Sequence, residues 1–178
     1  MQTRQSRSYQ LAAAALIAAA YTAFSLALTP LAFGPVQIRF SEALTLLAVF
    51  SPAAIWGVTL GCALTNAVGV ALGLVLPPDI VVGTLATLLA ALASWKLRKV
   101  RFRGLPVAAA LLPVAFNALL VGAELTWMFY PMEPRFFLFN AFTVGLGELV
   151  ACGALGLPLV WALERKGLAQ KLFGVQPS

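Results

Sequence analysis

The sequence predicts an all-α integral membrane bundle of six transmembrane helices, with both termini in the cytoplasm. Of its 178 residues, 61% are hydrophobic and 10% are charged, whereas roughly a quarter of a soluble domain is charged. Its mean hydropathy is +0.93. A spanning helix needs about 20 apolar residues, so the chain has room for six spans with very short connections. We therefore expect a single membrane domain over residues 1–178.

The first span is predicted at residues 9–29, a run that would be ~31 Å long as an α-helix. Arg4 and Arg7 precede it, as basic residues precede a signal peptide core. The run is longer than a usual signal core and the chain continues as membrane protein, so we expect it to be retained. Pro30 ends it. The remaining spans are predicted at residues 41–50, 53–76, 80–95, 105–130 and 135–163, of which the second is the shortest.

Lysine and arginine segregate to one side of this arrangement. Ten of the twelve fall on the side that carries both termini, and two fall on the other. The ten are Arg4, Arg7, Lys96, Arg98, Lys99, Arg101, Arg103, Arg165, Lys166 and Lys171. The two are Arg39 and Arg135. Because short cytoplasmic loops collect Lys and Arg, this bias predicts cytoplasmic termini and an even number of spans.

Several classes of function are disfavoured by what the sequence lacks. It contains no histidine, which removes His-based triads, His metal sites and His acid–base chemistry. No Gly-x4-Gly-Lys-Ser/Thr loop and no Gly-x-Ser-x-Gly elbow are present. Cys62 and Cys152 lie in apolar runs, where lone thiols act as small packing residues. The net charge of +6 follows membrane topology rather than a nucleic-acid-binding stripe. We predict no enzymatic activity, cofactor, metal or nucleic-acid partner.

Polar side chains inside the predicted spans form the candidate site. Glu148 falls roughly 18–20 Å into the last helix, near the midplane, where a carboxylate costs about 2.5–3.5 kcal/mol. Asn140 shares its helical face, and Asn117 and Glu124 share a face of the preceding helix. We expect a polar pocket open to the exterior, although each residue alone can instead join two helices. Trp127 lies at the outer end of the predicted span 105–130. It belongs either to an interfacial aromatic belt or to a pocket wall for a flat ligand.

The first predicted span carries a face of small residues. Ala14 and Ala18, and likewise Ala15 and Ala19, form small-xxx-small pairs. Such pairs let another helix approach closely in lipid. The face fits either a helix of this chain or a partner protein in the membrane.

A more specific signal lies after the first span, where residues 34–44 read GPVQIRFSEAL. This run resembles the signature loop of the queuosine-precursor transporter (QueT) family, whose members are substrate-binding S components of energy-coupling factor (ECF) transporters. Later segments fit the same family in order, so the resemblance spans nearly the whole chain. They are Pro52–Ile55 with Gly57, Gly61 and Asn66, then Asp79–Thr87, then Gly147–Leu149.

The resemblance implies that the chain captures a small molecule from outside a prokaryotic cell, at the cell membrane. Transport would then require a transmembrane coupling subunit and two cytoplasmic ATPases. The loop after the first helix typically covers the pocket in this family, which implies that Gln37, Arg39 and Glu42 lie near the ligand. In S components of this kind, an Ala-x3-Ala face of the first helix docks on the coupling subunit. That implies a docking role for residues drawn from Ala14, Ala15, Ala18 and Ala19.

The implied cargo, a 7-deazaguanine derivative, is chemically compatible with the predicted pocket. Its ring N–H and exocyclic amine lie side by side, and the Glu148 carboxylate can accept both in a bidentate pair. Its carbonyl needs a donor, which an amide of the pocket or Arg39 can supply. A cationic aminomethyl substituent would favour a second carboxylate such as Glu124 or Glu42. Another flat heterocycle that bears an amine would meet the same groups.

Two other classes of protein compete with this interpretation. A self-sufficient secondary transporter would use Glu148 and Glu124 as proton carriers. Inverted repeats would favour it, but no convincing repeat relates residues 9–95 to residues 105–163. A membrane scaffold held by its small-residue helices would leave the buried acids and amides unexplained.

Overall fold

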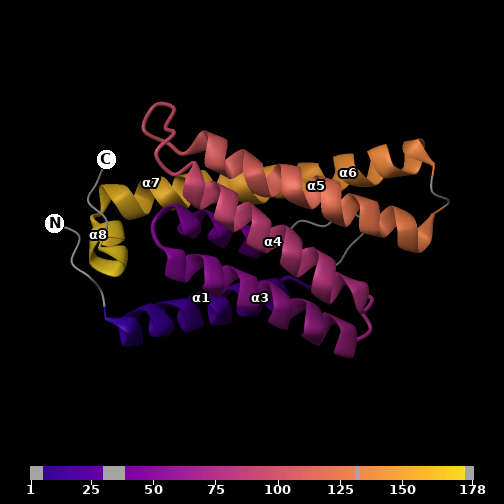
Figure 1. The fold of residues 1–178 in the computed structure, drawn as a ribbon, viewed down its shortest axis with the longest axis horizontal. Coiled ribbons are helices and arrows are strands. Elements are labelled where there is room, and N and C mark those ends of the chain that lie inside the picture. The colour runs from indigo at the N-terminus through magenta and orange to yellow at the C-terminus, as the bar shows by residue number, and fades with distance from the viewer. Residues whose placement is uncertain (1–5, 30–38, 131–132, 175–178) are drawn as a thin grey trace.

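The computed structural model describes residues 6–29, 39–130 and 133–174 of the chain. The regular structure of the described part is helical, and its one extended pairing is an isolated bridge between Phe102 and Leu105. Its elements lie roughly along the long axis of the molecule (Figure 1). In chain order they are α1 (Arg7–Ala27), η1 (Phe40–Val49), α3 (Pro52–Ala71), α4 (Pro78–Lys96), α5 (Val107–Phe129), α6 (Pro134–Glu148), η2 (Leu149–Gly156), α7 (Leu157–Arg165) and α8 (Leu168–Phe173). The all-helical prediction is confirmed for these residues.

Five helices in the described residues are long and apolar enough to cross a membrane. Four correspond to the predicted first, third, fourth and fifth spans. The third ends at Ala71 rather than at residue 76, and Gly73 follows with a φ of 70°. The fifth candidate is the continuous helical run Pro134–Arg165, which comprises α6, η2 and α7. The predicted boundaries of the other spans lie within about two residues of the observed ones.

The predicted second span is not confirmed as a transmembrane helix. Residues Phe40–Val49 form a ten-residue 3₁₀-helix, η1. At about 2.0 Å rise per residue it covers roughly 20 Å, which is less than the thickness of the hydrocarbon layer. It contacts α1, α3, α4, α5, α7 and η2, and most of its side chains are buried. Its continuous apolar character therefore reflects enclosure by protein rather than by lipid.

The last predicted span contains a feature that hydropathy does not reveal. Directly after Glu148, residues Leu149–Gly156 form a π-helix, η2. Such segments are rare and often occur at functional sites. η2 packs against η1, and at Gly156 an added Cβ would lie 2.8 Å from Leu46 Cδ1. The small residues of η2 thus allow η1 to lie deep in the bundle.

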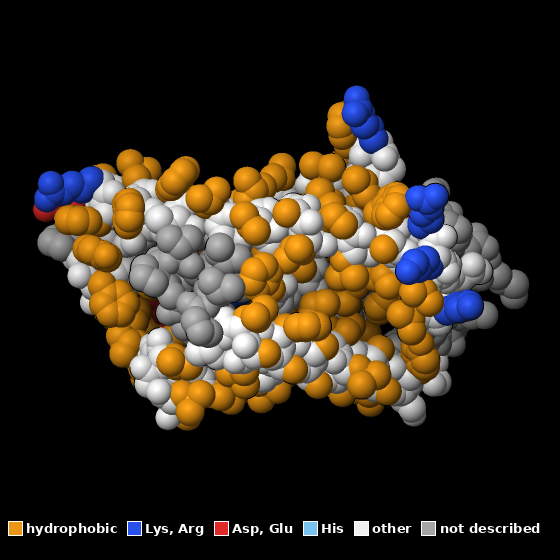
Figure 2. All heavy atoms as spheres, turned by 180° about the vertical axis from the view of Figure 1, so that it is seen from behind, with side chains coloured by type: hydrophobic (Ala, Val, Ile, Leu, Met, Phe, Trp, Pro, Cys, Tyr) orange, Lys and Arg blue, Asp and Glu red, His pale blue; other side chains and the backbone are white. Residues whose placement is uncertain are grey.

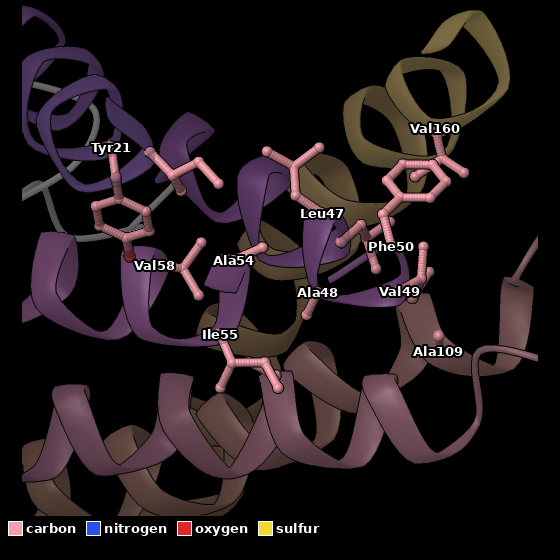
Figure 3. Close-up of a cluster of buried hydrophobic side chains, with 14 of the residues drawn as sticks. Tyr21, Leu47, Ala48, Val49, Phe50, Ala54, Ile55, Val58, Ala109 and Val160 are labelled. Atoms are coloured by element: carbon pink, nitrogen blue, oxygen red, sulfur yellow. The ribbon is translucent and has the colours of Figure 1, made fainter. Parts of the chain in front are cut away.

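A cluster of buried apolar side chains joins several helices. Side chains of α1, η1, α3, α5 and α7 converge in this cluster, including Tyr21, Phe50, Val58 and Val160 (Figure 3). Phe50 stacks on Phe173 of α8 with ring centroids 5.6 Å apart. This cluster fixes η1 in place and so fixes the polar residues at the start of η1.

Close packing of α1 on α3 corrects the predicted docking face. A Cβ added at Gly57 would lie 2.9 Å from the Ala14 carbonyl oxygen, and one added at Gly61 would lie 3.0 Å from that of Ala18. Ala14 and Ala18 are buried, so they face α3 within this chain and are not available to a partner. Their neighbours Ala15 and Ala19 are exposed.

Pro113 interrupts the hydrogen bonds of α5, and Ser94 compensates for it. A proline lacks the N–H that would donate to the carbonyl four residues earlier, which here belongs to Ala109. The Ser94 hydroxyl of α4 donates to the Ala109 carbonyl oxygen at 2.9 Å. Both Ser94 and Ala109 are completely buried, so this bond joins α4 to α5 and satisfies a carbonyl that water cannot reach.

Ser94→Ala is expected to destabilise the protein by about 1 kcal/mol, the usual contribution of one buried hydrogen bond. Thermal unfolding in detergent measures the loss. In a Pro113→Ala background, residue 113 regains an N–H that can donate to Ala109, so Ser94→Ala should then cost much less. An equal loss in both backgrounds would contradict the compensating role of Ser94.

The surface and the two ends of the molecule fit a membrane protein. Figure 2 shows apolar side chains across the middle of one face and Lys and Arg near its ends. The start of α1 and helix α8 lie at one end, with the loop between α4 and α5 (Figure 1). The Tyr9 hydroxyl donates to the Leu172 carbonyl oxygen at 3.0 Å, and Arg101 pairs with Glu164 at 2.8 Å. The predicted basic segments therefore share one end.

Candidate functional site

Ionisable side chains are concentrated inside the bundle. Arg39 precedes η1, Asp79 lies in the first turn of α4, Glu124 lies in α5, and Glu148 ends α6. Glu42 lies in the first turn of η1. All five side chains are buried, with exposed fractions between 1% and 6%. Groups of this kind are almost never buried without partners, so the cluster is the leading candidate site.

Arg39 is the central positive charge of this cluster. Its guanidinium interacts electrostatically with Asp79 and Glu42, and also with Glu124 and Glu148. One guanidinium therefore lies within electrostatic range of four carboxyl groups in the protein interior. A single positive charge cannot neutralise four carboxylates, and each unpaired buried charge costs several kcal/mol.

Glu42 is held by protein donors on several sides. The hydroxyls of Tyr21 and Thr87 donate to its Oε1, the latter at 3.2 Å, and Thr45 donates to its Oε2 at 2.8 Å. The Cys152 thiol donates to its backbone carbonyl oxygen at 3.4 Å. These donors come from α1, α4, η1 and η2. The resemblance implies that Glu42 lies near the ligand. Its acceptor oxygens are, however, occupied by protein donors, which favours a role in holding four elements together.

Glu148 lines a small cavity inside the bundle. The other lining residues are Arg39, Asn117, Val121 and Val144. The cavity has a volume of about 10 Å³, roughly the space that one water occupies. A two-ring heterocycle would need these side chains to move apart. Cys152 Sγ also lies 3.8 Å from Glu148 Oε2, but its single hydrogen is closer to the Glu42 carbonyl, so the thiol is at most a weak partner for the Glu148 carboxylate.

The spacing predictions for α5 and α6 agree with this arrangement. Asn117 and Glu124 are both buried on α5 with Val121 between them. Asn140 and Glu148 are both buried on α6 with Val144 between them. Both amides make hydrogen bonds within the bundle: Asn117 donates to the Pro113 carbonyl oxygen at 3.1 Å, and Asn140 donates to Thr126 Oγ1 of α5 at 3.0 Å. Of the two, Asn117 lines the cavity.

Asp79 and Glu124 form a second acidic group, between α4 and α5. Their carboxyl groups are close enough to interact directly. With both groups ionised, neither oxygen of Glu124 nor Oδ1 of Asp79 accepts a hydrogen bond in the described part of the chain, and the two side chains can bond to each other only through a shared proton. The Asn66 amide donates to the Asp79 backbone carbonyl at 2.8 Å. Gly83 makes room for this contact, because its added Cβ would lie 2.8 Å from Asn66 Nδ2.

Asp79 is not among the site residues predicted from the sequence. It follows two prolines at the start of an apolar span, which favours an exposed turn at the outer face. The signal that could have identified it is its place in Asp79–Thr87, a segment that carries the family resemblance. In the structure Asp79 is 3% exposed.

Two other predicted residues are not placed in the cluster. Trp127 is 66% exposed, so it faces outward, as an interfacial belt residue does. Gln37 lies outside the described residues. Among the described residues, no group of three or more Cys, Asp or Glu side chains is arranged to hold a metal ion.

Several long apolar helices enclosing a buried charged cluster define a multi-pass membrane protein with an internal polar site. The model of the QueT transporter family matches residues 11–165. The chain therefore belongs to the QueT transporter family.

A curated relative supports this assignment. The chain is 32% identical over 87 residues to a protein of Lactococcus lactis subsp. cremoris (strain MG1363) named "Queuosine precursor transporter QueT". The match covers 48% of each chain, so it spans about half the length of this relative. No solved structure matches the fold.

Proposed function

We propose that the chain is the substrate-binding S component of an ATP-driven ECF importer, and that it captures a queuosine precursor from outside a prokaryotic cell. The family membership and the relative's name support a transporter of this class of cargo. The observation that carries the proposal is the cavity in which Glu148 faces Arg39 and Asn117. It combines a carboxylate acceptor with two kinds of donor inside a membrane protein.

The cavity groups match the polar edge of a 7-deazaguanine. The ring N–H and exocyclic amine would donate to the two oxygens of Glu148 as a bidentate pair. The base carbonyl would accept from Arg39 or from the Asn117 amide, and Val121 and Val144 would contact the flat ring. Opening the cavity around the base would replace a weak thiol contact of Glu148 with two charge-assisted bonds. That exchange supplies binding energy.

An uptake assay tests the proposal. Cells that express this chain with an ECF coupling subunit and its two ATPases should accumulate labelled 7-aminomethyl-7-deazaguanine, whereas cells with this chain alone should not. ATPases inactivated in their nucleotide-binding loops are the control. Accumulation by the chain alone, abolished when the proton gradient is collapsed, would instead support the secondary transporter that uses its buried carboxylates as proton carriers.

The exposed face of α1 is the proposed docking surface for the coupling subunit. Ala15 and Ala19 are one helical turn apart and exposed, so a partner helix can approach the backbone there. Ala14 and Ala18 are excluded, because they pack on α3.

Ala15→Trp with Ala19→Trp should abolish ATP-driven uptake but leave ligand binding by the isolated chain within about twofold. The bulky rings would hold a partner helix away without touching the buried site. Ala123→Trp places the same ring on an exposed position of α5 and should preserve uptake. Equal loss of uptake in Ala123→Trp would argue against a specific α1 surface.

A further inference from the structure

The acidic pair Asp79–Glu124 has no role in the recognition of the base described above. Glu148 faces the cavity, and the oxygens of Glu42 accept from Tyr21, Thr45 and Thr87. Asp79 and Glu124 are the two buried carboxyl groups of the cluster that have no assigned role. Glu124 is 5% exposed, and neither of its oxygens accepts a hydrogen bond from the described residues.

Two buried carboxyl groups in contact are unfavourable unless a positive charge or a shared proton lies between them. Arg39 interacts with both, but it also interacts with Glu42 and with Glu148. Its one charge is thus divided among four carboxyl groups. The pair therefore needs either a shared proton or one further cation to balance its charge.

The chemistry of the pair specifies the kind of cation. Coordination of a metal ion is not supported, because the described residues contain no cluster of three suitable ligands. An alkylammonium group carries one positive charge and three N–H donors, and the unsatisfied oxygens Glu124 Oε1, Glu124 Oε2 and Asp79 Oδ1 are three acceptors. A protonated amine would satisfy these acceptors and the charge at once.

We propose that Asp79 and Glu124 are the receptor for a protonated amine on the transported ligand, so that the site selects a cationic 7-deazaguanine over a neutral one. This inference rests on the proposed function, because the base must lie at Glu148 for its substituent to extend to the pair. Arg39 lines the cavity together with Glu148. Its Nη1 also lies 3.8 Å from a Cβ added at Gly83, one helical turn after Asp79 on α4, so the guanidinium lies between Glu148 and the start of α4. An aminomethyl substituent supplies the amine, whereas a nitrile substituent supplies neither charge nor donor.

Calorimetry on the purified chain tests the inference with two ligands, 7-aminomethyl-7-deazaguanine and 7-cyano-7-deazaguanine. The wild-type chain should bind the amine at least tenfold more tightly than the nitrile. Glu124→Gln should reduce that ratio to about twofold or less, mainly by weakening the amine. Asp79→Asn should act in the same direction and serves as a second variant if Glu124→Gln does not fold. Glu148→Gln should weaken both ligands and leave the ratio nearly unchanged.

The outcomes separate this inference from the proposed function. Equal binding of the two ligands by the wild-type chain would overturn the amine receptor and leave capture of a 7-deazaguanine intact. An unchanged ratio in folded Glu124→Gln and Asp79→Asn would also overturn it and would indicate a carboxyl pair that shares a proton. Failure of both ligands to bind a folded wild-type chain would overturn the proposed function, and the amine receptor with it.

Discussion

Glu148→Gln is expected to weaken binding of 7-aminomethyl-7-deazaguanine at least tenfold, which corresponds to about 1.4 kcal/mol. A glutamine side chain keeps the size of glutamate but has one acceptor oxygen in place of two and carries no charge. It cannot accept the two adjacent N–H groups of the base as a bidentate pair. Calorimetry on the purified chain in detergent measures the change in Kd.

The matched control for Glu148→Gln is Glu133→Gln. Glu133 is exposed and forms its ion pair with Arg135 at the protein surface, so the same chemical change should leave the Kd within about twofold. The two variants should also unfold within a few degrees of the wild-type chain. Unchanged ligand affinity in a folded Glu148→Gln variant would remove Glu148 from the binding site.

Gly57→Ala combined with Gly61→Ala should cause the largest loss of stability. The added carbons would lie 2.8 Å from Ile17 Cβ and 2.7 Å from Tyr21 Cβ, so α1 must move away from α3. Overpacking costs about 1–3 kcal/mol at each position, against a gain of about 1 kcal/mol each from better helix propensity. Displacement of α1 would also pull the Tyr21 hydroxyl from Glu42, which adds a lost buried hydrogen bond.

Thermal unfolding in detergent measures this effect, with Gly153→Ala as the control. At Gly153 the nearest atom to an added Cβ is Leu149 Cδ1 at 3.6 Å, an ordinary contact, so the melting temperature should change little. If the double variant melts at the wild-type temperature, α1 does not pack on α3 through these glycines.

The structure shows why residues in one sequence segment take different roles. Arg39 and Glu42 both belong to the run that carries the family resemblance. Arg39 lines the cavity with Glu148, whereas Glu42 is held by hydroxyls from α1, α4 and η1. The three hydroxyl donors are separated from Glu42 by as much as 45 positions. No local pattern predicts such a set, because it depends on which helices meet.

Helix periodicity predicted the inward faces of α5 and α6 correctly, but it could not distinguish the roles of the residues on them. Asn117 and Asn140 are both buried amides. Asn117 lines the cavity and donates to Pro113 of its own helix, whereas Asn140 donates to Thr126 on the neighbouring helix. Likewise, four alanines on α1 gave two equivalent docking registers, and only the contact with α3 decided between them.

The sequence by itself determined the helical membrane class, five of the spans, the family and the buried acids on α5 and α6. The membrane class and the spans follow from the hydropathy of successive residues, and the buried faces follow from the helical period. Both depend only on residues that are close together in the sequence. The tertiary structure decided that the second predicted span is a short enclosed 3₁₀-helix. It also decided that a π-helix follows Glu148 and that Asp79 meets Glu124. Those features arise from contacts between distant segments, where packing and buried charge override local preference.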